Sequence, residues 1–452
     1  MRNNADEIVR QSLRGFLSMV ERDFPEELLR IRAPVRTHLD ITSLVFELEH
    51  AGRSPVVVYE NVEGHTMPVV TNIAGNRKLL AACLGVEPAN LPTAFRERCQ
   101  KYIPCEVVLT RLPIPLHFSV DAAPYITAGQ IAARDPVSGV DTTGFHRLMV
   151  KGKNRLGVSL HSRRRMHEFH RRAEERGNAL PAAITLGIHP LHYMGSMVYA
   201  YPPHVRKFEI IGGLFGEPYR LAKTGVQDIE VPAGAEIIIE GEILAHVREP
   251  EGPFSEFTGY ASYRSTQNVF VAHRIRMRQD AMYHSIVSGM SQDHILVSCV
   301  TREGEILNTL RRNLPNVIAV HVPHRTCGAF LAIVKMKKTA QGEPQQAIMA
   351  ALGTEFYTKY VIVVDEDVDI FDMNDVMWAV ATRVHAEKDI VFIPGCKGAI
   401  LDPTSDPETF TVTKMGIDAT RPSGKDFAER LVISEEQRAR VRGILEAAGV
   451  KL

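Results

Sequence analysis

Two glutamates flank a Gly-Pro turn in the segment REPEGPFSEFTGY, residues 248–260. Glu251 and Glu256 are five residues apart, and the turn between them can fold back so that both carboxylates reach one pocket. Paired carboxylates in different environments let a protein separate a proton donor from a charge stabiliser. Because most surface carboxylates have no such role, the spacing alone supports a surface turn with two solvated acids equally well.

A single arginine stands out in a second segment, TTGFHRLMVKGKNRLGVSLHSRRR, residues 142–165. Arg147 lies three residues after Gly144, in an alternating apolar and basic pattern that predicts a strand. A buried arginine in a strand needs a carboxylate or phosphate partner, and its planar guanidinium suits oxyanions. Composition alone favours the alternative, an arginine at a strand edge that reaches water.

The same segment ends in three consecutive arginines, residues 163–165, which Arg171 and Arg172 follow. In a chain without net charge, this run is a candidate anion site, and a cofactor phosphate is one candidate ligand. A solvated helix start is the commoner explanation of such a run.

Two patterns that suggest metal sites carry less weight. The acidic run at residues 365–375 has Ile370 where a calcium loop requires glycine, so it predicts a strand end and a helix cap. His189 and His192 have the helical spacing of metal ligands, but Pro190 between them argues against a regular helix. No third ligand is evident beside them.

The gross composition excludes several classes of protein. The 452 residues suffice for two or three domains. A net charge of +0 gives no field that attracts nucleic acid or membrane. The sequence has no apolar run long enough to span a bilayer, no signal peptide and no CxxC among its six cysteines. We therefore expect a cytoplasmic protein without nucleic-acid or membrane partners.

Four regions follow from the pattern of apolar residues. Residues 1–104 mix helices with a buried strand, SPVVVYENV, and form an N-terminal α/β portion. Residues 105–300 contain many short strands and one helical insert near 164–176, which predicts a β-barrel or sandwich. Residues 301–422 alternate strands and helices, which predicts a mostly parallel sheet. In residues 423–452, Ser434 and Gln437 form a capping-box pattern, and we predict a final helix that serves oligomerisation.

Taken together, the segments resemble the UbiD family. That family carries an Asn-x-Gly-x-x-Arg strand upstream of a Glu-Gly-Pro-aromatic-Gly/Ser-Glu/Asp-x-x-Gly-Tyr segment. Here the first reads TTGFHR, residues 142–147, and the second is complete at residues 251–260. The stretches GNALPAAITLGIHP, IIGGLFGEP, KYVIVVDEDVDIFDMNDVMWAVATR, ILDPTS and KMGIDAT also match, so the resemblance covers nearly the whole chain.

The resemblance implies a fold and an activity. The fold is of the α+β or α/β class, with a central split β-barrel like that of flavin reductases, α/β portions on either side and a C-terminal helix that reaches a neighbouring subunit. The activity is non-oxidative decarboxylation of an aromatic, heteroaromatic or α,β-unsaturated carboxylic acid with prenylated FMN, which a separate flavin prenyltransferase supplies. Glu256 corresponds to the proton donor, and Arg147 with Glu251 to the network around it. The runner-up is an FMN-binding split-barrel oxidoreductase.

The resemblance also indicates which residues bind the cofactor. They are Phe145, His146, Arg147, Ser159, Leu160, His161, Arg164, Arg165, Lys207 and Lys359. Family members commonly bridge the cofactor phosphate through a divalent metal, but the positions of two usual ligands hold Thr142 and Lys207 here. The third position falls within residues 163–165. A site lined by cations repels a divalent ion, so we expect neither manganese nor potassium and predict that Lys207 with Arg164 or Arg165 holds the phosphate. In a register shifted by two residues, Glu209 would restore one ligand.

Overall fold

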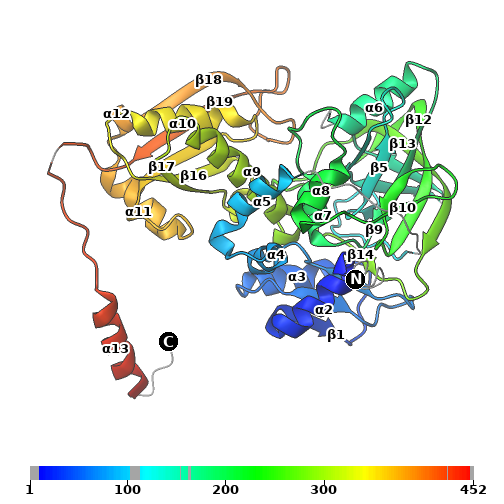
Figure 1. The fold of residues 1–452 in the computed structure, drawn as a ribbon, viewed down its shortest axis with the longest axis horizontal. Helices are drawn as coiled ribbons and strands as arrows, with labels where there is room; N and C mark the ends of the chain where they lie inside the picture. The colour runs from blue at the N-terminus through cyan, green and yellow to red at the C-terminus, as the bar shows by residue number, and fades with distance from the viewer. Residues whose placement is uncertain (1–9, 102–111, 153, 161–163, 425, 448–452) are drawn as a thin grey trace.

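The computed structural model describes residues 10–101, 112–152, 154–160, 164–424 and 426–447. Figure 1 shows an N-terminal and a central part packed together, a C-terminal α/β part beside them, and a last helix apart from all three. The fold class expected from the sequence is confirmed.

The N-terminal part is a small mixed sheet with helical cover. Its strand order is β1-β2-β3-β14, and strand β14 is contributed by residues far along the chain. The predicted strand is present as β2, whose four residues are all buried. Among its helices is α4, which Asn76 caps at its start and Gly85 ends in the left-handed conformation that glycine adopts readily. The bounds are α2 (Leu13–Asp23), β1 (Leu28–Ile31), α3 (Asp40–His50), β2 (Val56–Tyr59), β3 (Val69–Thr71), α4 (Arg77–Leu84), α5 (Leu91–Cys99) and β14 (Tyr283–His284).

The central part is an eight-stranded sheet in which every neighbouring pair is antiparallel. Its order is β4-β7-β8-β13-β12-β9-β5-β6, and the long strands β12 and β13 form its spine. The short strands predicted for residues 105–300 are present in the part of the chain that the structure describes, and the strand-like segment CEVVLT, residues 105–110, lies outside that part. Their bounds are β4 (Tyr125–Ile126), β5 (Gln130–Arg134), β6 (Asp141–Phe145), β7 (Leu148–Gly152), β8 (Arg155–Val158), β9 (Leu180–Leu186), β12 (Ile237–Glu251) and β13 (Ser265–Met277), and a separate pair comprises β10 (Leu221–Lys223) and β11 (Glu230–Pro232).

Two helices in the central part were not predicted. The expected insert is α6 (Arg165–Glu174), but α7 (Pro190–Ser196) and α8 (Lys207–Phe215) accompany it. The inference that Pro190 disfavours a helix was wrong. Proline is the first residue of α7, where its missing N–H costs no hydrogen bond, and His189 caps the helix by accepting from the Leu191 N–H. Both α7 and α8 pack into the largest apolar core, which the N-terminal helices share.

The C-terminal sheet is mixed rather than mostly parallel. Its order is β15-β16-β17-β19-β18, and both edge strands run antiparallel to their neighbours. Only the two inner pairings are parallel, so the prediction was wrong at the edges. The helix α9 runs through residue 300, where the sequence pattern changes. The bounds are α9 (Gln292–Arg311), β15 (Val317–His321), β16 (Leu331–Met336), α10 (Glu343–Thr354), β17 (Tyr360–Asp365), α11 (Met373–Arg383), α12 (Ala386–Asp389), β18 (Ile390–Lys397) and β19 (Thr411–Ala419).

The predicted final helix is α13 (Glu435–Ala447). The Ser434 hydroxyl accepts the Gln437 N–H at 3.2 Å, as the capping pattern indicates. Figure 1 shows α13 at the end of an extended segment, away from the body of the chain. Apolar side chains along this tail are exposed, among them Leu431, at 98%, and Ile444. None of the helices described is long and apolar enough to cross a membrane.

Candidate active site

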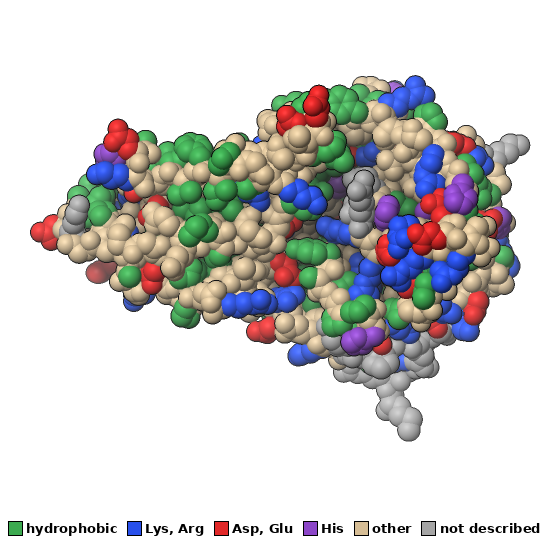
Figure 2. Space-filling view, turned by 90° about the horizontal axis from the view of Figure 1, so that it is seen from above, with side chains coloured by type: hydrophobic (Ala, Val, Ile, Leu, Met, Phe, Trp, Pro, Cys, Tyr) green, Lys and Arg blue, Asp and Glu red, His purple; other side chains and the backbone are tan. Residues whose placement is uncertain are grey.

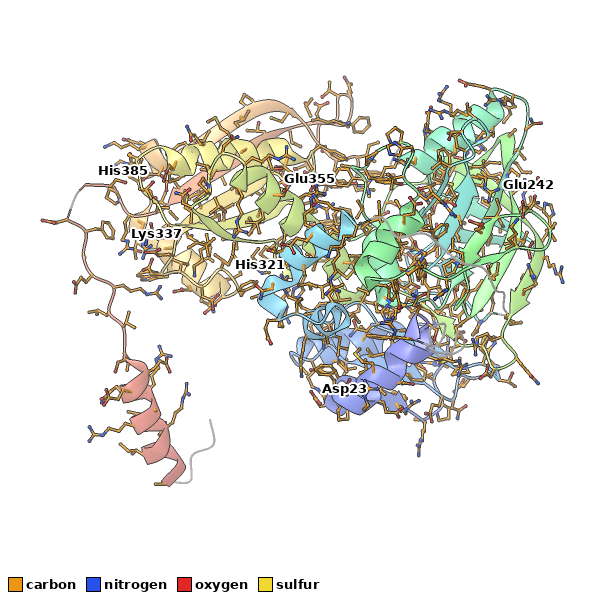
Figure 3. The ribbon with its side chains drawn as sticks, viewed as in Figure 1. Asp23, Glu242, His321, Lys337, Glu355 and His385 are labelled. Carbon is orange, nitrogen blue, oxygen red and sulfur yellow. The ribbon has the colours of Figure 1, made fainter. Side chains whose placement is uncertain are left out.

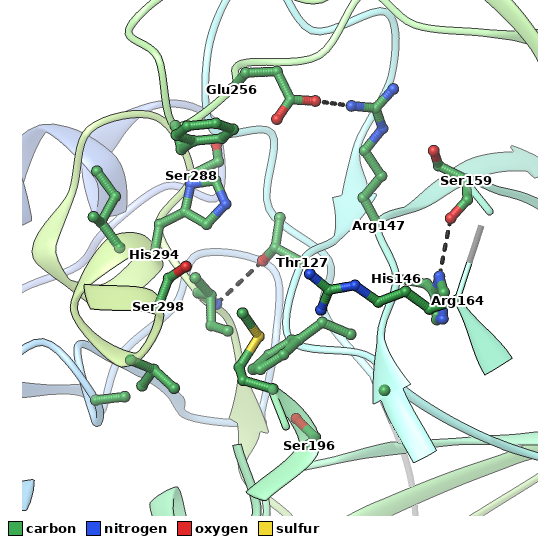
Figure 4. A pocket seen from close by; sticks show the side chains of 18 of the residues that line it. Thr127, His146, Arg147, Ser159, Arg164, Ser196, Glu256, Ser288, His294 and Ser298 are labelled. Atoms are coloured by element: carbon green, nitrogen blue, oxygen red, sulfur yellow. Dashed lines mark hydrogen bonds and ion pairs between the residues drawn. The ribbon is translucent and has the colours of Figure 1, made fainter. Parts of the chain in front are cut away.

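A cavity of about 280 Å³ lies where the central sheet meets the start of α9 and the C-terminal part. This volume is near the lower limit of about 300 Å³ for small-molecule sites. Figure 4 shows Arg147 and Glu256 on one wall, Arg164 on another, and Ser288, His294 and Ser298 facing them. Figure 3 places Glu355, which pairs with the lining residue Arg302, on the side of the C-terminal part that faces the central one. Away from the cavity, Figure 2 shows basic side chains beside acidic ones, in keeping with the zero net charge.

Arg147 joins the two glutamates of the Gly-Pro segment. Its Nε donates to Glu251 Oε1 at 2.9 Å and its Nη2 to Glu251 Oε2 at 2.8 Å. Its Nη1 donates to Glu256 Oε1. Glu251 is fully buried and Glu256 nearly so. This arrangement excludes the two surface alternatives, a turn with solvated acids and an arginine that reaches water, because two buried acids share one cation that is itself largely buried.

The backbone explains how the acids converge. Arg147 lies in the two-residue link between β6 and β7 rather than within a strand, and Glu251 is the last residue of β12. Gly252 follows with a φ of 89°, where a Cβ would lie 2.9 Å from the Tyr263 carbonyl oxygen, so only glycine fits there. The loop then folds back, because the Glu256 N–H donates to the Tyr260 carbonyl at 3.0 Å.

The opposite end of the cavity is cationic. Lys207 is 8% exposed and donates from Nζ to the Ser196 carbonyl at 2.8 Å. Arg165 stacks on the Tyr201 ring, 3.6 Å from its centre, and donates only to backbone carbonyls. Arg164 faces the Tyr199 ring at 5.0 Å. Within the described residues, none of the three cations forms an ion pair with a carboxylate.

Burial has an electrostatic cost at this end. Burial, together with the charges of Arg164 and Arg165, lowers the pKa of Lys207 to about 7. Burial also lowers the pKa of Arg164. The two arginines thus disfavour the charged form of Lys207, and an anionic ligand bound here would favour it, which indicates a site for an anion.

The structure describes two of the positions where the family's usual metal ligands lie, those of Thr142 and Lys207. Thr142 lines the cavity and its hydroxyl is 3.3 Å from the Tyr201 hydroxyl. Glu209, the residue of the shifted register, does not line the cavity. Its carboxylate accepts the Arg206 N–H at 3.1 Å and caps α8. Among the described residues, no group of three or more His, Cys, Asp or Glu side chains could hold a metal ion.

The other residues inferred for the cofactor fall into three groups. Phe145, His146 and Ser159 line the cavity, where the His146 ring meets the Ser159 carbonyl at 2.9 Å. His161 lies outside the described residues. Leu160 and Lys359 do not line the cavity. Leu160 packs into an apolar core, and Lys359 is committed to Asp402 at 2.7 Å.

The cavity wall that α9 supplies was not predicted from the sequence. His294, Ser298 and Arg302 recur at a spacing of four residues and so face the same side of the helix. Arg302 is neutralised by Glu355 at 2.5 Å. The helical period itself was the available signal, but nothing in the sequence indicates which face of α9 meets the cavity.

The comparisons with known proteins agree with this geometry. The N-terminal, Rift-related and C-terminal domains of 3-octaprenyl-4-hydroxybenzoate carboxy-lyase match residues 22–99, 92–291 and 295–419. These three are the domains of the UbiD proteins, a class of decarboxylases. The chain belongs to the UbiD family.

Individual relatives span almost the whole chain. It is 33% identical to the anhydromevalonate phosphate decarboxylase of Methanothermobacter thermautotrophicus, over 91% of this chain and 97% of that protein. Its fold is similar to that of the UbiD-class enzyme HmfF from Pelotomaculum thermopropionicum in complex with FMN, with 34% identity, a TM-score of 0.90 and coverage of 96% and 99%. An evolved dimeric form of HmfF in complex with prFMN matches with 34% identity, a TM-score of 0.84 and coverage of 94% and 97%.

Proposed function

We propose that this enzyme decarboxylates an aromatic, heteroaromatic or α,β-unsaturated carboxylic acid with prenylated FMN, and that Glu256 is the proton donor. The observation that carries the proposal is Arg147, which bridges two buried glutamates on the wall of a cavity. Membership of a family of decarboxylases supports the reaction class.

The cavity fits a phosphorylated flavin. Its cationic end has Lys207, Arg164 and Arg165, none of which pairs with a carboxylate among the described residues, and its middle is bounded by Phe145, whose ring stacks on Tyr193 at 5.0 Å. Two complexes of HmfF, one with FMN and one with prFMN, support the cofactor class. When bound, prenylated FMN supplies the electrophile that accepts the electron pair released with carbon dioxide.

The protein's own residues supply orientation and a proton. Each turnover consumes one proton, since a carboxylate becomes carbon dioxide and a C–H bond. Glu256 lines the cavity and is the acid of the pair that faces it, so it holds that proton at a carboxyl oxygen. Glu251 does not line the cavity. It fixes the plane of the Arg147 guanidinium through two hydrogen bonds, and Arg147 in turn orients Glu256.

The phosphate end supports a direct anchor rather than a metal bridge. Lys207 and Arg165 both contact Tyr201, and Thr142 hydrogen-bonds to the same ring's hydroxyl. Three cations repel a divalent ion, whereas a phosphate gains charge-assisted hydrogen bonds from them. We therefore propose that Lys207, Arg164 and Arg165 hold the cofactor phosphate without manganese or potassium.

Reconstitution tests the reaction. The protein loaded with prenylated FMN by a flavin prenyltransferase should release carbon dioxide from at least one acid in a panel of aromatic, heteroaromatic and polyenoic acids, to which anhydromevalonate phosphate is added. Oxidation of NADH without release of carbon dioxide would instead support the split-barrel oxidoreductase. Hydride transfer needs no pair of acids, so the geometry favours the first outcome.

Metal analysis tests the anchor. Elemental analysis of protein loaded with FMN should find no stoichiometric manganese, and FMN should stay bound after chelation with EDTA. Stoichiometric manganese, together with loss of FMN on its removal, would overturn the direct anchor while leaving the reaction class intact.

A further inference from the structure

A third carboxylate lies behind the loop that bears Glu256. Asp121 is nearly buried, in the turn that precedes β4. Its Oδ1 accepts the Ser255 N–H at 2.7 Å, and its Oδ2 accepts the Phe118 N–H at 3.1 Å. Ser255 immediately precedes Glu256, so Asp121 holds the backbone from which that side chain departs.

The turn around Asp121 encloses the same loop at further points. The Ala122 N–H donates to the Pro253 carbonyl at 3.0 Å. The Tyr125 ring packs on Phe254, 4.6 Å between ring centres, and Phe254 in turn lies under the Arg147 guanidinium. The segment at 118–125 and the loop at 253–256 are therefore one packed unit, although they lie far apart in sequence.

The hydroxyl of Ser255 connects this loop to the cavity wall. Its Oγ is 2.6 Å from the Oγ of Ser288, and Ser288 lines the cavity. Asp121 thus accepts the backbone N–H of Ser255, and Ser288 forms a hydrogen bond with the side chain of Ser255. Both contacts are buried, where an unmade hydrogen bond costs about 1–3 kcal/mol.

The charges around Asp121 are few. Burial raises the pKa of its carboxyl, while the hydrogen bonds from Ser255 and Phe118 and the charge of Arg147 act in the opposite sense. Asp121 is therefore coupled to the same cation that binds Glu251 and Glu256.

We propose that Asp121 is a positioning residue for the proton donor. It holds the Ser255 N–H, with Ser288 on the other side of the same residue, and so fixes the direction in which Glu256 reaches Arg147 and the cavity. The inference rests on the proposed function, because it assigns Asp121 a role through Glu256. Asp121 neither lines the cavity nor contacts the reacting atoms.

The test is Asp121→Asn in the full chain. The amide is nearly the same size, but it has one acceptor oxygen for two N–H donors, so one hydrogen bond is lost. Exchange of the Ser255 amide hydrogen, followed by mass spectrometry of peptides covering residues 253–258, should become about tenfold faster. This measurement needs neither cofactor nor substrate.

Kinetics with the best acid of the panel give the second measurement. Misplacing a reacting group by about 1 Å costs on the order of 100-fold. We therefore expect kcat to fall about 10- to 100-fold with KM within about threefold. The solvent deuterium isotope effect on kcat should rise, since delivery of the proton becomes slower than the other steps.

Asp135→Asn is the matched control. Asp135 is also buried and accepts a backbone N–H, that of Val137 at 3.1 Å, but it lies in the β5–β6 turn and does not line the cavity. This variant should leave kcat and the isotope effect unchanged. A kcat of Asp121→Asn within threefold of wild type, or an equal loss in the control, would overturn the proposal.

Two further variants keep the test decisive. If Asp121→Asn fails to fold, Ser255→Ala removes the same 2.6 Å hydroxyl contact at a residue that does not line the cavity. This variant should still lower kcat severalfold with a raised isotope effect, and an unchanged kcat would refute the role. Full activity of Glu256→Gln would instead refute the donor assignment. If Glu256→Gln loses activity while Asp121→Asn keeps it, the role of Asp121 alone is refuted.

Discussion

Arg147 binds Glu251 in a fork, with parallel hydrogen bonds from Nε and Nη2 to the two carboxylate oxygens, and this leaves Nη1 for Glu256. One cation thus binds two acids, of which only Glu256 lines the cavity and can reach a ligand there. The asymmetry assigns different roles to two residues of the same chemical type.

Glu256→Gln should retain the fold and the cofactor but lose decarboxylation. The amide is isosteric and can still accept from Arg147, but it has no proton to give. A positioned acid contributes at least about 100-fold, so kcat should fall by that factor or more. The measurement is carbon dioxide release by protein with equal cofactor content.

Glu249→Gln provides the control for that variant. Glu249 is on the same strand β12 but pairs with Arg155 at the surface. Its activity should equal that of wild type. Activity of Glu256→Gln within a few-fold of wild type would remove Glu256 from the mechanism.

Arg147→Lys should not be a conservative change. A lysine keeps the charge but has no planar fork, so it cannot hold Glu251 with two parallel bonds and reach Glu256 as well. Both KM and kcat should suffer, because the guanidinium lies on the cavity wall. Normal turnover by the lysine variant would show that the fork is dispensable.

Much of this site could be predicted from local patterns, and the failures share one physical cause. The complete Gly-Pro segment identified Glu251 and Glu256, and alternation identified the strands. Asp121, Ser288 and the lining face of α9 meet the site only through tertiary packing. Strand β14 likewise joins the N-terminal sheet from more than 200 residues away. No sequence window contains such contacts.

Lys359 shows why an ion-pair partner cannot be predicted from the sequence. The resemblance to the family implied that Lys359 binds the cofactor. The structure pairs it with Asp402, which the loop after β18 brings to it. A charge in sequence does not reveal its partner, and a satisfied ion pair has little affinity left for a ligand. Lys207 differs because its described contacts include no acid.

Binding of FMN should weaken as pH rises through about 7. Burial lowers the pKa of Lys207 to about 7 in the free protein. Below that pH the side chain is charged and attracts the phosphate, and above it a proton must be taken up on binding. The affinity for FMN should then fall by up to about tenfold per pH unit, since one proton is linked to binding.

Riboflavin, which has no phosphate, is the control ligand, and fluorescence titration between pH 6 and 9 is the measurement. Its affinity should vary less across this range. In Lys207→Met the decline in FMN affinity above pH 7 should disappear. An equal decline for riboflavin and FMN would show that another group titrates.

Lys207→Glu should reverse the preference of the site. A carboxylate at this position repels phosphate, so FMN retention should fall, and added manganese should restore it by bridging the two anions. Lys223→Glu makes the same charge change at an exposed position and should have no effect. Weak binding that manganese does not restore would mean that the other ligands of a metal site are missing.

The tail should mediate assembly into at least a dimer. Residues 423–447 end in α13, and its predicted apolar face includes Val441, Ile444 and Leu445. Val441 and Ile444 are exposed on the single chain, as are Leu431 and Val432 before the helix. Covering apolar surface of this kind with a second subunit contributes about 25 cal/mol per Å² to association.

Light scattering of the full chain should therefore give a mass of two or more subunits, and truncation near Pro422 should cause dissociation or aggregation. The double variant Val441→Glu with Ile444→Glu should dissociate the assembly, whereas Arg440→Glu, which changes a polar position of the same helix, should not. A full-length protein that is monomeric at micromolar concentration would refute this prediction, and an assembly that survives truncation would place the interface elsewhere.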